Sequence, residues 1–493
     1  MMPSATLVQA ADGDFVWAKR MGQTLDDIGY GIVVDSVGNV YSTGYFQGTV
    51  DFDPGAGMTT LSSAGNNDIF ISKLDSTGNL VWARGLGSLY DDVGVGIFVD
   101  SAGNVYTTGS FGGTVDFDPG AAVFELTSVG SSDVFISKLD SRGNFVGAWA
   151  MGGTTDDYGN GVLVDSGGNI YTTGYFKNTV DFDPGGGSFF LTSEGVEDIF
   201  ISKQDNSGNF VWVKAMGGAA ADVGLGISLY SSGHIYTTGW FQGTVDFDPG
   251  TGPGEIFELT SSNGTYDIYI SKLDSNGNFV WARAMGGPSE DVGQAVSVDP
   301  AGNVYSTGWF NGTVDFDPGD AGMFNLTSAG SGDIYISKLD SGGKFVWAKG
   351  MGGAFSDVGY GISVDSSGNV YSTGFFQGIA DFDPGLGGGQ VFERTSVGNA
   401  DIYVSKLNSR GDFLWARAMG GTSDDYGYGV SVDSAGNVYS IGFFQGSADF
   451  DPGDGVVNLV SAGFEDIFIS KLAGPDIFPW PMFLPAIINN SRP

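Results

Sequence analysis

Short runs of apolar and aromatic residues, separated by glycine-rich turns, recur along the chain. In the first repeat these runs cover residues 29–35, 39–46, 68–74 and 80–84. They are rich in Val, Ile, Phe, Tyr and Trp, which favour strands, and no apolar stripe with a helical period persists. Two of the runs are apolar at successive positions, as expected for strands that are covered on both faces. The pattern predicts four β-strands per repeat and an all-β protein.

The whole pattern is repeated seven times. Asp-Phe-Asp-Pro-Gly begins at residues 51, 116, 181, 246, 315, 381 and 449, and a Ser-Lys pair and a Trp-containing strand recur with the same period. The last repeat lacks its Trp strand, while an extra one, residues 14–20, precedes the first repeat. Radial stacking of four-stranded sheets is the arrangement that such repeats favour. We therefore predict a seven-bladed β-propeller of four-stranded blades, closed by the N-terminal strand, which completes the last blade.

The two ends of the chain differ from the repeats. We expect the propeller to cover residues 12–472, with residues 1–11 as a leader remnant or disordered start. Residues 473–493 form a C-terminal tail with several prolines, for which a sorting or attachment role is one interpretation. No segment is apolar over a length that would span a membrane as a helix.

Three motifs resemble the secreted bacterial β-propeller repeat family known as SBBP. They are Asp-x-x-Gly-Asn-Val-Tyr-x-Thr-Gly at residues 35–44, Asp-Ile-Phe-Ile-Ser-Lys-Leu at 68–74, and Gly-Gly-x-x-x-Asp-x-Gly at 352–359. The resemblance extends over about residues 12–472. It implies a seven-bladed propeller on an exported or envelope protein, and hence an extracellular or cell-envelope location. It implies no particular activity.

Composition narrows the range of functions. The chain has 57 acidic and 20 basic residues, a formal net charge of −37, no cysteine and one histidine, His234, in a tight turn. Disulfides, Cys–His or Ser–His–Asp catalysis and zinc sites are thereby excluded. The negative charge repels nucleic acid and attracts cations and basic partners. We expect a monomeric, non-catalytic binding or structural scaffold whose ligand is a glycan or a protein.

The alternative is a carbohydrate-active or other hydrolytic enzyme. It would use carboxylates in the central channel or on the loop face, which is the face of the propeller that carries the long loops. Paired carboxylates are sufficient for glycoside hydrolysis. Sevenfold repetition argues against this alternative, because a catalytic pair should be a single break in the symmetry.

Four aspartate positions recur in every repeat; in the first they are Asp27, Asp51, Asp53 and Asp68. Two long loops occur in each repeat, one before its first strand and one between its second and third strands. For Asp27 and Asp68 we favour capping of backbone amides in these loops. For Asp51 and Asp53 two interpretations stay open, namely capping and oxygen ligation of Ca²⁺. A third is pairing with the repeated lysine, Lys73 in the first copy. The predicted Ca²⁺ ligands are Asp51, Asp53, Asp116, Asp118, Asp181, Asp183, Asp246, Asp248, Asp315, Asp317, Asp381, Asp383, Asp449 and Asp451.

A second candidate is the position after the glycine of the second strand. It holds Tyr45, Ser110, Tyr175, Trp240, Trp309, Phe375 and Phe443. Exposed aromatic rings here could stack on sugars, whereas buried ones would pack between neighbouring blades. We favour packing.

Overall fold

The computed structural model describes residues 11–250, 256–319, 322–383, 385 and 391–475. Within these residues every element is a β-strand except one 3₁₀ turn, η1 (Ser262–Gly264). The paired strands are antiparallel, and the prediction of an all-β protein is confirmed. In this part of the chain no helix is long or apolar enough to cross a membrane. The predicted leader and tail lie almost entirely outside the described residues.

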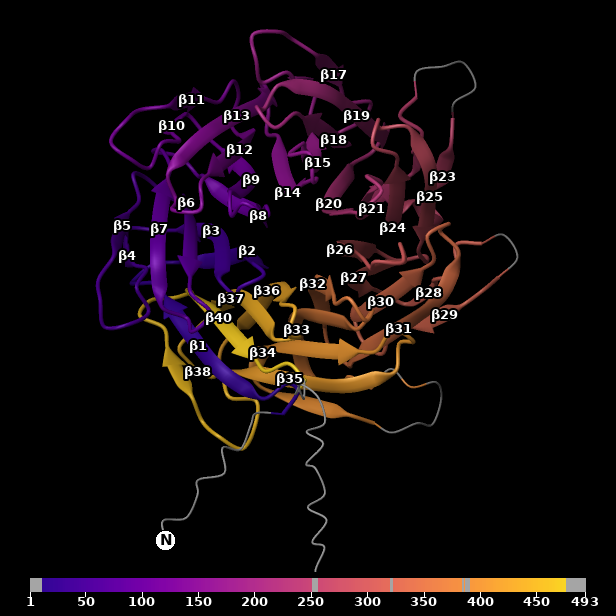
Figure 1. The fold of residues 1–493 in the computed structure, drawn as a ribbon. Helices are drawn as coiled ribbons and strands as arrows, with labels where there is room; N and C mark the ends of the chain where they lie inside the picture. The colour runs from indigo at the N-terminus through magenta and orange to yellow at the C-terminus, as the bar shows by residue number, and fades with distance from the viewer. Residues whose placement is uncertain (1–10, 251–255, 320–321, 384, 386–390, 476–493) are drawn as a thin grey trace, which may run out of the picture.

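The long strands form units of four, and we name each unit after its innermost strand (Figure 1). The β2 unit has the order β2-β3-β6-β7, formed by β2 (Ile28–Val34), β3 (Val40–Phe46), β6 (Asp68–Leu74) and β7 (Leu80–Leu86). These bounds agree with the predicted strands to within two residues.

The remaining units repeat this order from the middle of the molecule outwards. The innermost strands are β8 (Val93–Val99), β14 (Tyr158–Val164), β20 (Asp222–Leu229), β26 (Asp291–Val298), β32 (Val358–Val364) and β36 (Asp425–Val432). The second strands are β9 (Val105–Phe111), β15 (Ile170–Phe176), β21 (Ile235–Gln242), β27 (Val304–Phe310), β33 (Val370–Asp381) and β37 (Val438–Phe444). The third strands are β12 (Asp133–Leu139), β18 (Asp198–Gln204), β24 (Tyr266–Leu273), β30 (Asp333–Leu339), β34 (Glu393–Leu407) and β40 (Asp466–Leu472). The outermost strands are β13 (Phe145–Gly153), β19 (Phe210–Gly218), β25 (Phe279–Met285), β31 (Phe345–Gly353), β35 (Phe413–Gly421) and, for the β36 unit, β1 (Phe15–Met21).

The first strand of the chain therefore pairs with its last. β1 runs antiparallel to β40, with Ala18 opposite Ser470 and Arg20 opposite Phe468. β2, which follows β1, lies beside both β8 and β36. The chain thus begins and ends its described strands within the same sheet.

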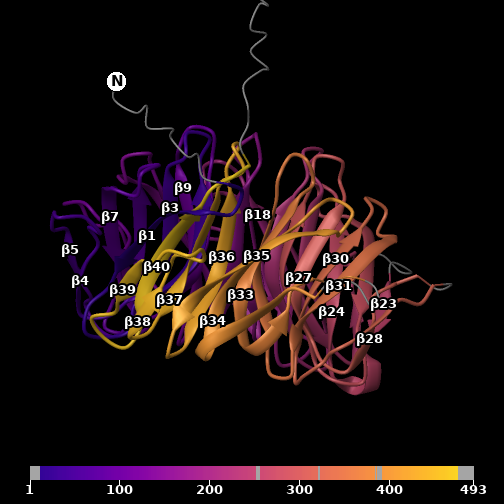
Figure 2. The same ribbon diagram turned by 90° about the horizontal axis from the view of Figure 1, so that it is seen from below.

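The long loop after the second strand contains a short hairpin at the periphery (Figures 1 and 2). The pairs are β4 (Thr49–Asp51) with β5 (Thr60–Ser62), β10 (Thr114–Asp116) with β11 (Glu125–Thr127), β16 (Thr179–Asp181) with β17 (Phe190–Thr192), β22 (Thr244–Asp246) with β23 (Glu258–Thr260), β28 (Thr313–Asp315) with β29 (Asn325–Thr327), and β38 (Ser447–Asp449) with β39 (Asn458–Val460). In the β32 unit the corresponding segments continue β33 and β34. Several hairpins bond to the outermost strand of the preceding unit, as β16 does to β13 and β38 to β35. They therefore cover part of an edge that would otherwise be open.

Each unit has its own aromatic core. In the β2 unit Phe46, Phe52 and Phe70 are fully buried. The ring of Phe52, the middle residue of Asp-Phe-Asp-Pro-Gly, lies 5.5 Å from that of Phe46 and 5.1 Å from that of Phe70. Burial of one such ring stabilises the fold by about 1.5–3 kcal/mol. The phenylalanine therefore fixes the acidic turn to its sheet.

The repeated tryptophan packs against the next unit. Trp82 lies on Gly143, where a Cβ atom would come within 2.9 Å of the indole, and its Nε1 donates to the Ser141 carbonyl at 3.3 Å. Gly143 also has φ of +75°, which disfavours other residues. Trp149, which is displaced by two positions in its repeat, lies in the same way on Gly208. The repeated tryptophan therefore packs between neighbouring units.

Candidate functional site

The Asp-Phe-Asp-Pro-Gly turn is built around two carboxylates that accept backbone amides. Oδ1 of Asp51 accepts the amides of Asp53 at 3.0 Å and Thr59 at 2.8 Å. Oδ1 of Asp53 accepts the amide of Gly55 at 2.8 Å. Both side chains are partly buried. The first aspartate therefore ties the two strands of the hairpin together, and the second closes the Pro-Gly turn.

The same contacts recur in every copy. The first aspartate, which accepts two amides, is Asp116, Asp181, Asp246, Asp315, Asp381 or Asp449. The second, which accepts the amide of the motif glycine, is Asp118, Asp183, Asp248, Asp317, Asp383 or Asp451. All fourteen predicted ligands thus act as backbone caps, and their ligation of Ca²⁺ stays a prediction. No group of three or more His, Cys, Asp or Glu side chains in the described residues could hold a metal ion. A Ca²⁺ ion in a turn would therefore need backbone carbonyls and water as further ligands.

The repeated lysine does not pair with these aspartates. Lys73 donates to the Ser141 carbonyl of the next unit at 3.4 Å, and its Nζ lies 4.8 Å from the centre of the Tyr41 ring. In the β32 unit Lys406 instead forms an ion pair with Asp12 at 2.7 Å. The repeated lysine therefore joins neighbouring units, and the third interpretation of Asp51 and Asp53 is wrong.

Asp27 and Asp68 are buried and also cap loops. Asp27 accepts the amides of Gln23 at 2.9 Å and Gln47 at 3.0 Å, which joins the loop before β2 to the end of β3. Asp68 accepts the amide of Ala64 at 2.8 Å. These contacts agree with the capping interpretation. They also explain the first glycine of the Gly-Gly motif, which is Gly87 in this repeat, because a Cβ atom at Gly87 would lie 2.2 Å from Cγ of Asp68.

The buried aspartates meet in pairs where two units join. In one pair, a Cβ atom built on Gly352 would lie 2.8 Å from Cγ of Asp333 and 2.9 Å from Oδ2 of Asp357. Burial, together with the charge of Asp333, raises the pKa of Asp357 to about 6. Burial likewise raises the pKa of Asp27 to about 7 and that of Asp68 to about 6. Because equivalent pairs recur around the molecule, they do not single out one catalytic site.

One aromatic cluster breaks the repetition. A β-bulge in every innermost strand leaves one residue without a partner, and in three units that residue is Tyr30, Tyr360 or Tyr428. The ring of Tyr428 lies 5.0 Å from that of Tyr30 and 4.9 Å from that of Tyr360. In the other units the bulge residues are Val95, Asn160, Leu225 and Gln294. Sequence reasoning missed this cluster, although its signal is the Gly-Tyr-Gly triplet in three of the repeats.

The aromatic position of the second strand has mixed surroundings. Phe375 and Phe443 are buried, whereas Tyr45, Tyr175, Trp240 and Trp309 are partly exposed. The ring of Trp240 lies 4.2 Å from that of Tyr266, and the ring of Phe375 stacks on Tyr426 of the next unit at 4.3 Å. The contact of Phe375 with Tyr426 crosses to the next unit, as the packing interpretation predicts, whereas Trp240 and Tyr266 belong to the same unit.

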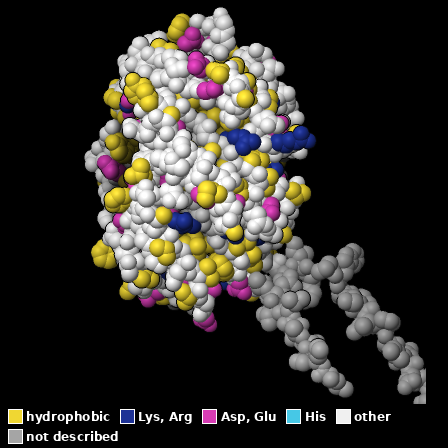
Figure 3. Space-filling view, turned by 90° about the vertical axis from the view of Figure 1, so that its left-hand side faces the viewer, with side chains coloured by type: hydrophobic (Ala, Val, Ile, Leu, Met, Phe, Trp, Pro, Cys, Tyr) yellow, Lys and Arg dark blue, Asp and Glu magenta, His cyan; other side chains and the backbone are white. Residues whose placement is uncertain are grey.

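Grooves between neighbouring units lie beside the acidic turns. One, of about 730 Å³, is lined by Arg283 and Phe345 together with Asp317 and Pro318 of the following turn. Another, of about 460 Å³, has Arg84, Asp118 and Pro119 at the corresponding positions. The outer side of the molecule carries scattered apolar and charged side chains (Figure 3). Like the aspartate pairs, the grooves are a repeated feature of the fold.

Comparison with known proteins supports the repeat assignment. Residues 16–45 match the model of the SBBP family, described as a beta-propeller repeat. An uncharacterized WD repeat-containing protein of Acanthamoeba polyphaga mimivirus is 25% identical over 510 residues, which cover 88% of this chain and 36% of that protein. The regulatory protein FlaEY of Caulobacter vibrioides is 23% identical over 489 residues, covering 93% of this chain and 47% of that protein. The chain spans less than half the length of these curated relatives.

Two solved structures give further matches. The WD40 domain of Pan2 from Neurospora crassa has a TM-score of 0.36 and 12% identity, covering 78% of this chain and 90% of that one. Sqt1 from Chaetomium thermophilum has a TM-score of 0.41 and 10% identity, covering 94% of this chain and 100% of that one. From the family match and the repeated antiparallel units, the chain is a β-propeller repeat protein.

Proposed function

We propose that this protein is a non-catalytic scaffold that binds other proteins through its long loops and outer strands. The observation that carries the proposal is the distribution of exposed apolar side chains. Leu89, Tyr90 and Phe355 in the loops before the innermost strands are exposed, as are Met58 and Met323 in the acidic hairpins. Exposed apolar and aromatic side chains in long loops are residues of the kind that anchor a protein partner.

The short turns at the other ends of the strands carry far fewer exposed apolar side chains than the long loops do. Of the exposed large apolar side chains in the described residues, Val37 alone lies in one of these turns. The remaining exposed side chains in this class lie in the long loops, the hairpins or the outermost strands. The asymmetry between the two ends of the strands supports recognition of a partner through the long loops.

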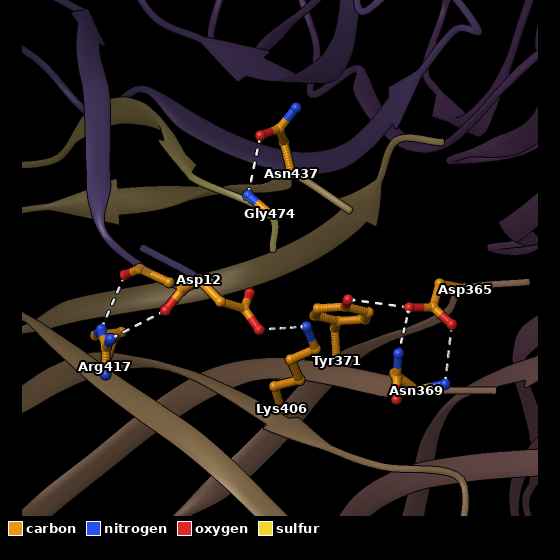
Figure 4. Close-up of polar contacts among 9 residues, drawn as sticks. Asp12, Asp365, Asn369, Tyr371, Lys406, Arg417, Asn437 and Gly474 are labelled. Carbon is orange, nitrogen blue, oxygen red and sulfur yellow. Dashed lines mark hydrogen bonds and ion pairs between the residues drawn. The ribbon is translucent and has the colours of Figure 1, made fainter. Parts of the chain in front are cut away.

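We further propose that the units form a closed, seven-bladed ring. The pairing of β1 with β40 supports closure, as does the position of β2 beside β8 and β36. Asp12 adds a polar junction (Figure 4): its carboxylate pairs with Lys406, and its carbonyl accepts from Arg417 at 3.3 Å. The Gly13 carbonyl also accepts from Arg417, at 2.8 Å. A closed ring would hold the long loops in fixed positions and leave only short, protected sheet edges.

We also propose that the protein is not an enzyme and that it is exported. The paired aspartates recur at successive junctions, which is unlike a single catalytic constellation. The curated relatives are named as a WD repeat-containing protein and a regulatory protein, and neither name is that of an enzyme. Export to the envelope or the exterior is supported by the resemblance to secreted propeller repeats.

Site-specific photo-crosslinking in the source cells would test partner binding. With a benzophenone amino acid at position 90, we expect a crosslinked protein adduct, because Tyr90 is 61% exposed in a long loop. The same replacement at position 37 is the matched control, since Val37 is 73% exposed in a short turn. Adducts from position 37 but not from 90, or from neither, would contradict the proposal.

We also propose that Ca²⁺ binds at the acidic turns, and paired substitutions would separate ligation from capping. Asp51→Ala removes the acceptor of two amides and is expected to lower the free energy of unfolding by about 1–2 kcal/mol, whereas Asp51→Asn keeps an acceptor oxygen and should cost less. If Ca²⁺ binds, millimolar Ca²⁺ should raise the melting temperature by several degrees over chelator. The Asp51→Asn, Asp53→Asn variant should then bind one ion fewer by calorimetry. Asp454→Asn, an exposed aspartate in another hairpin loop, is the control for the change in charge. An unchanged melting temperature with no heat of binding would exclude the Ca²⁺ sites.

A further inference from the structure

A partly buried acidic side chain lies near the aromatic cluster described above. Glu465, which directly precedes β40, is partly buried. Its Oε1 accepts a hydrogen bond from Nε2 of Gln445 at 3.2 Å. Burial raises the pKa of the Tyr30 and Tyr428 phenols, and the negative charge of Glu465 contributes to the increase at both. The carboxylate therefore lies within electrostatic range of the tyrosines that the bulges bring together.

More rings surround this group. The ring of Tyr426 lies 5.0 Å from that of Phe443, and that of Tyr428 lies 6.0 Å from Phe443. Tyr30 in turn contacts Tyr45 at 6.0 Å between ring centres. We name Tyr30, Tyr45, Tyr426, Tyr428, Phe443 and Glu465 the Glu465 cluster. Its tyrosines are partly exposed, so part of their ring surface is accessible to a ligand.

The negative charge of Glu465 has no cationic partner in the described part of the chain, where the ion pairs join Arg20 to Asp466, Lys177 to Glu197 and Lys406 to Asp12. Burial raises the pKa of Glu465, and the nearby charges of Asp26 and Asp424 raise it further. A cation that binds beside a partly buried carboxylate stabilises its charged form, and other acids nearby add to this effect.

Another unit of the same chain shows what fits this position. In the β14 unit, Glu197 occupies the position that corresponds to Glu465, and Lys177 the position of Gln445. Lys177 Nζ lies 3.0 Å from Oε1 of Glu197 and 5.8 Å from the centre of the Tyr175 ring. Tyr158 stacks on Tyr175 at 5.1 Å, as Tyr426 contacts Phe443 in the β36 unit. The β14 unit thus carries its own ammonium group between a glutamate and aromatic rings.

In the β36 unit the lysine is replaced by glutamine, and the glutamate and aromatic rings remain. The bulge residue changes from Asn160 to Tyr428, which adds an aromatic ring. We propose that the Glu465 cluster binds an organic cation, an alkylammonium or guanidinium group, from outside the chain. The rings supply cation–π attraction and Glu465 supplies the opposite charge. This site does not depend on partner binding through the long loops.

Calorimetric titration of the full chain would test the site with choline, butylammonium and methylguanidinium. The neutral analogue of choline, 3,3-dimethyl-1-butanol, controls for apolar binding. We expect the cations to bind with a Kd below about 10 mM and the alcohol to bind at least about tenfold more weakly. Short peptides with a single lysine or arginine would distinguish a protein side chain from a free small cation as the source of the group.

Gln445→Lys restores the arrangement of the β14 unit and is expected to abolish binding of the added cation. Gln242→Lys places the same substitution at the corresponding position of the β20 unit and should leave binding unchanged. Glu465→Gln should weaken binding about tenfold or more without introducing a new cation. Melting curves of each variant would verify folding. Failure of every cation to bind, equal binding of the alcohol, or undiminished binding to folded Gln445→Lys and Glu465→Gln would overturn the proposal.

Discussion

The free energy of unfolding is expected to fall by at least about 3 kcal/mol between pH 5 and pH 8. A pKa that is about one unit higher in the folded than in the unfolded state, at each of only two buried aspartates, is enough to account for this decrease. Burial raises the pKa of Asp27 to about 7 and that of Asp68 to about 6 in the folded protein. In the unfolded chain an aspartate has a pKa near 4. Between about pH 4 and pH 7 the folded state therefore holds more protons than the unfolded state, so its stability decreases as the pH rises through this window.

The same decrease in stability with rising pH is expected from the equivalent aspartates at the other six junctions. The aspartates equivalent to Asp27 whose pKa is raised to about 6 or 7 are Asp92, Asp157, Asp222, Asp291, Asp357 and Asp425. Turn residues such as Asp75, whose pKa hydrogen bonds lower to about 2, act in the opposite direction and lose their contribution only as the pH falls below about 4. Maximum stability is thus expected near pH 4–5. Urea unfolding at a series of pH values would measure it, and stability that rises from pH 5 to pH 8 would contradict it.

A single substitution would locate the source of this pH dependence. Oδ2 of Asp333 accepts the amide of Ala329 at 2.9 Å, while no residue in the described part of the chain donates a hydrogen bond to its buried Oδ1. Asp333→Asn can keep the first contact and remove the charge beside Asp357. We expect this variant to be more stable than the parent at pH 8 and to lose stability less steeply with rising pH. Asp454→Asn, which removes an exposed charge, should leave the slope unchanged. Equal slopes for the two variants would show that the buried pairs are not responsible.

An intramolecular disulfide between Ala18→Cys and Ser470→Cys is the second large effect that we expect. These residues lie opposite each other where β1 pairs with β40, and the chain has no other cysteine. The bond would link residues that are 452 positions apart. The oxidised variant should be more stable than the same variant after reduction by about 2–5 kcal/mol, since the cross-link restricts the unfolded chain.

Equivalent positions in the neighbouring sheet provide matched controls. Ala83 corresponds to Ala18 and lies opposite Ser72. The pair Ala83→Cys, Ser72→Cys should also form an internal disulfide, whereas Ala83→Cys, Ser470→Cys should not. Non-reducing electrophoresis and mass spectrometry would distinguish internal bonds from linked dimers. Linked dimers from the Ala18→Cys, Ser470→Cys variant, or a complete lack of bond formation, would argue against ring closure.

Much of the architecture could be predicted from local patterns. Four strands of the first repeat were predicted to within two residues, because each consists of β-branched and aromatic residues between Gly-Asn or Asp-Pro-Gly turns. The hairpin of β4 and β5 was missed, since three-residue strands in a glycine-rich loop have too few positions to show alternation. For the acidic turns the sequence left capping and cation binding open. The three-dimensional structure shows that Asp51 and Asp53 cap backbone amides.

The amino-acid sequence by itself determined the period, the strand content and the excess of negative charge, because these depend on each repeat taken separately. Contacts between repeats were decided by the tertiary structure. Tyr30 and Tyr428 are nearly 400 residues apart, yet their rings lie 5.0 Å apart, because β2 packs beside β36. The partner of Lys73 is likewise a backbone carbonyl of the next unit, which no side-chain pattern reveals. Periodic sequence specifies each sheet through local propensity, whereas side-chain neighbours across a junction depend on how two sheets pack.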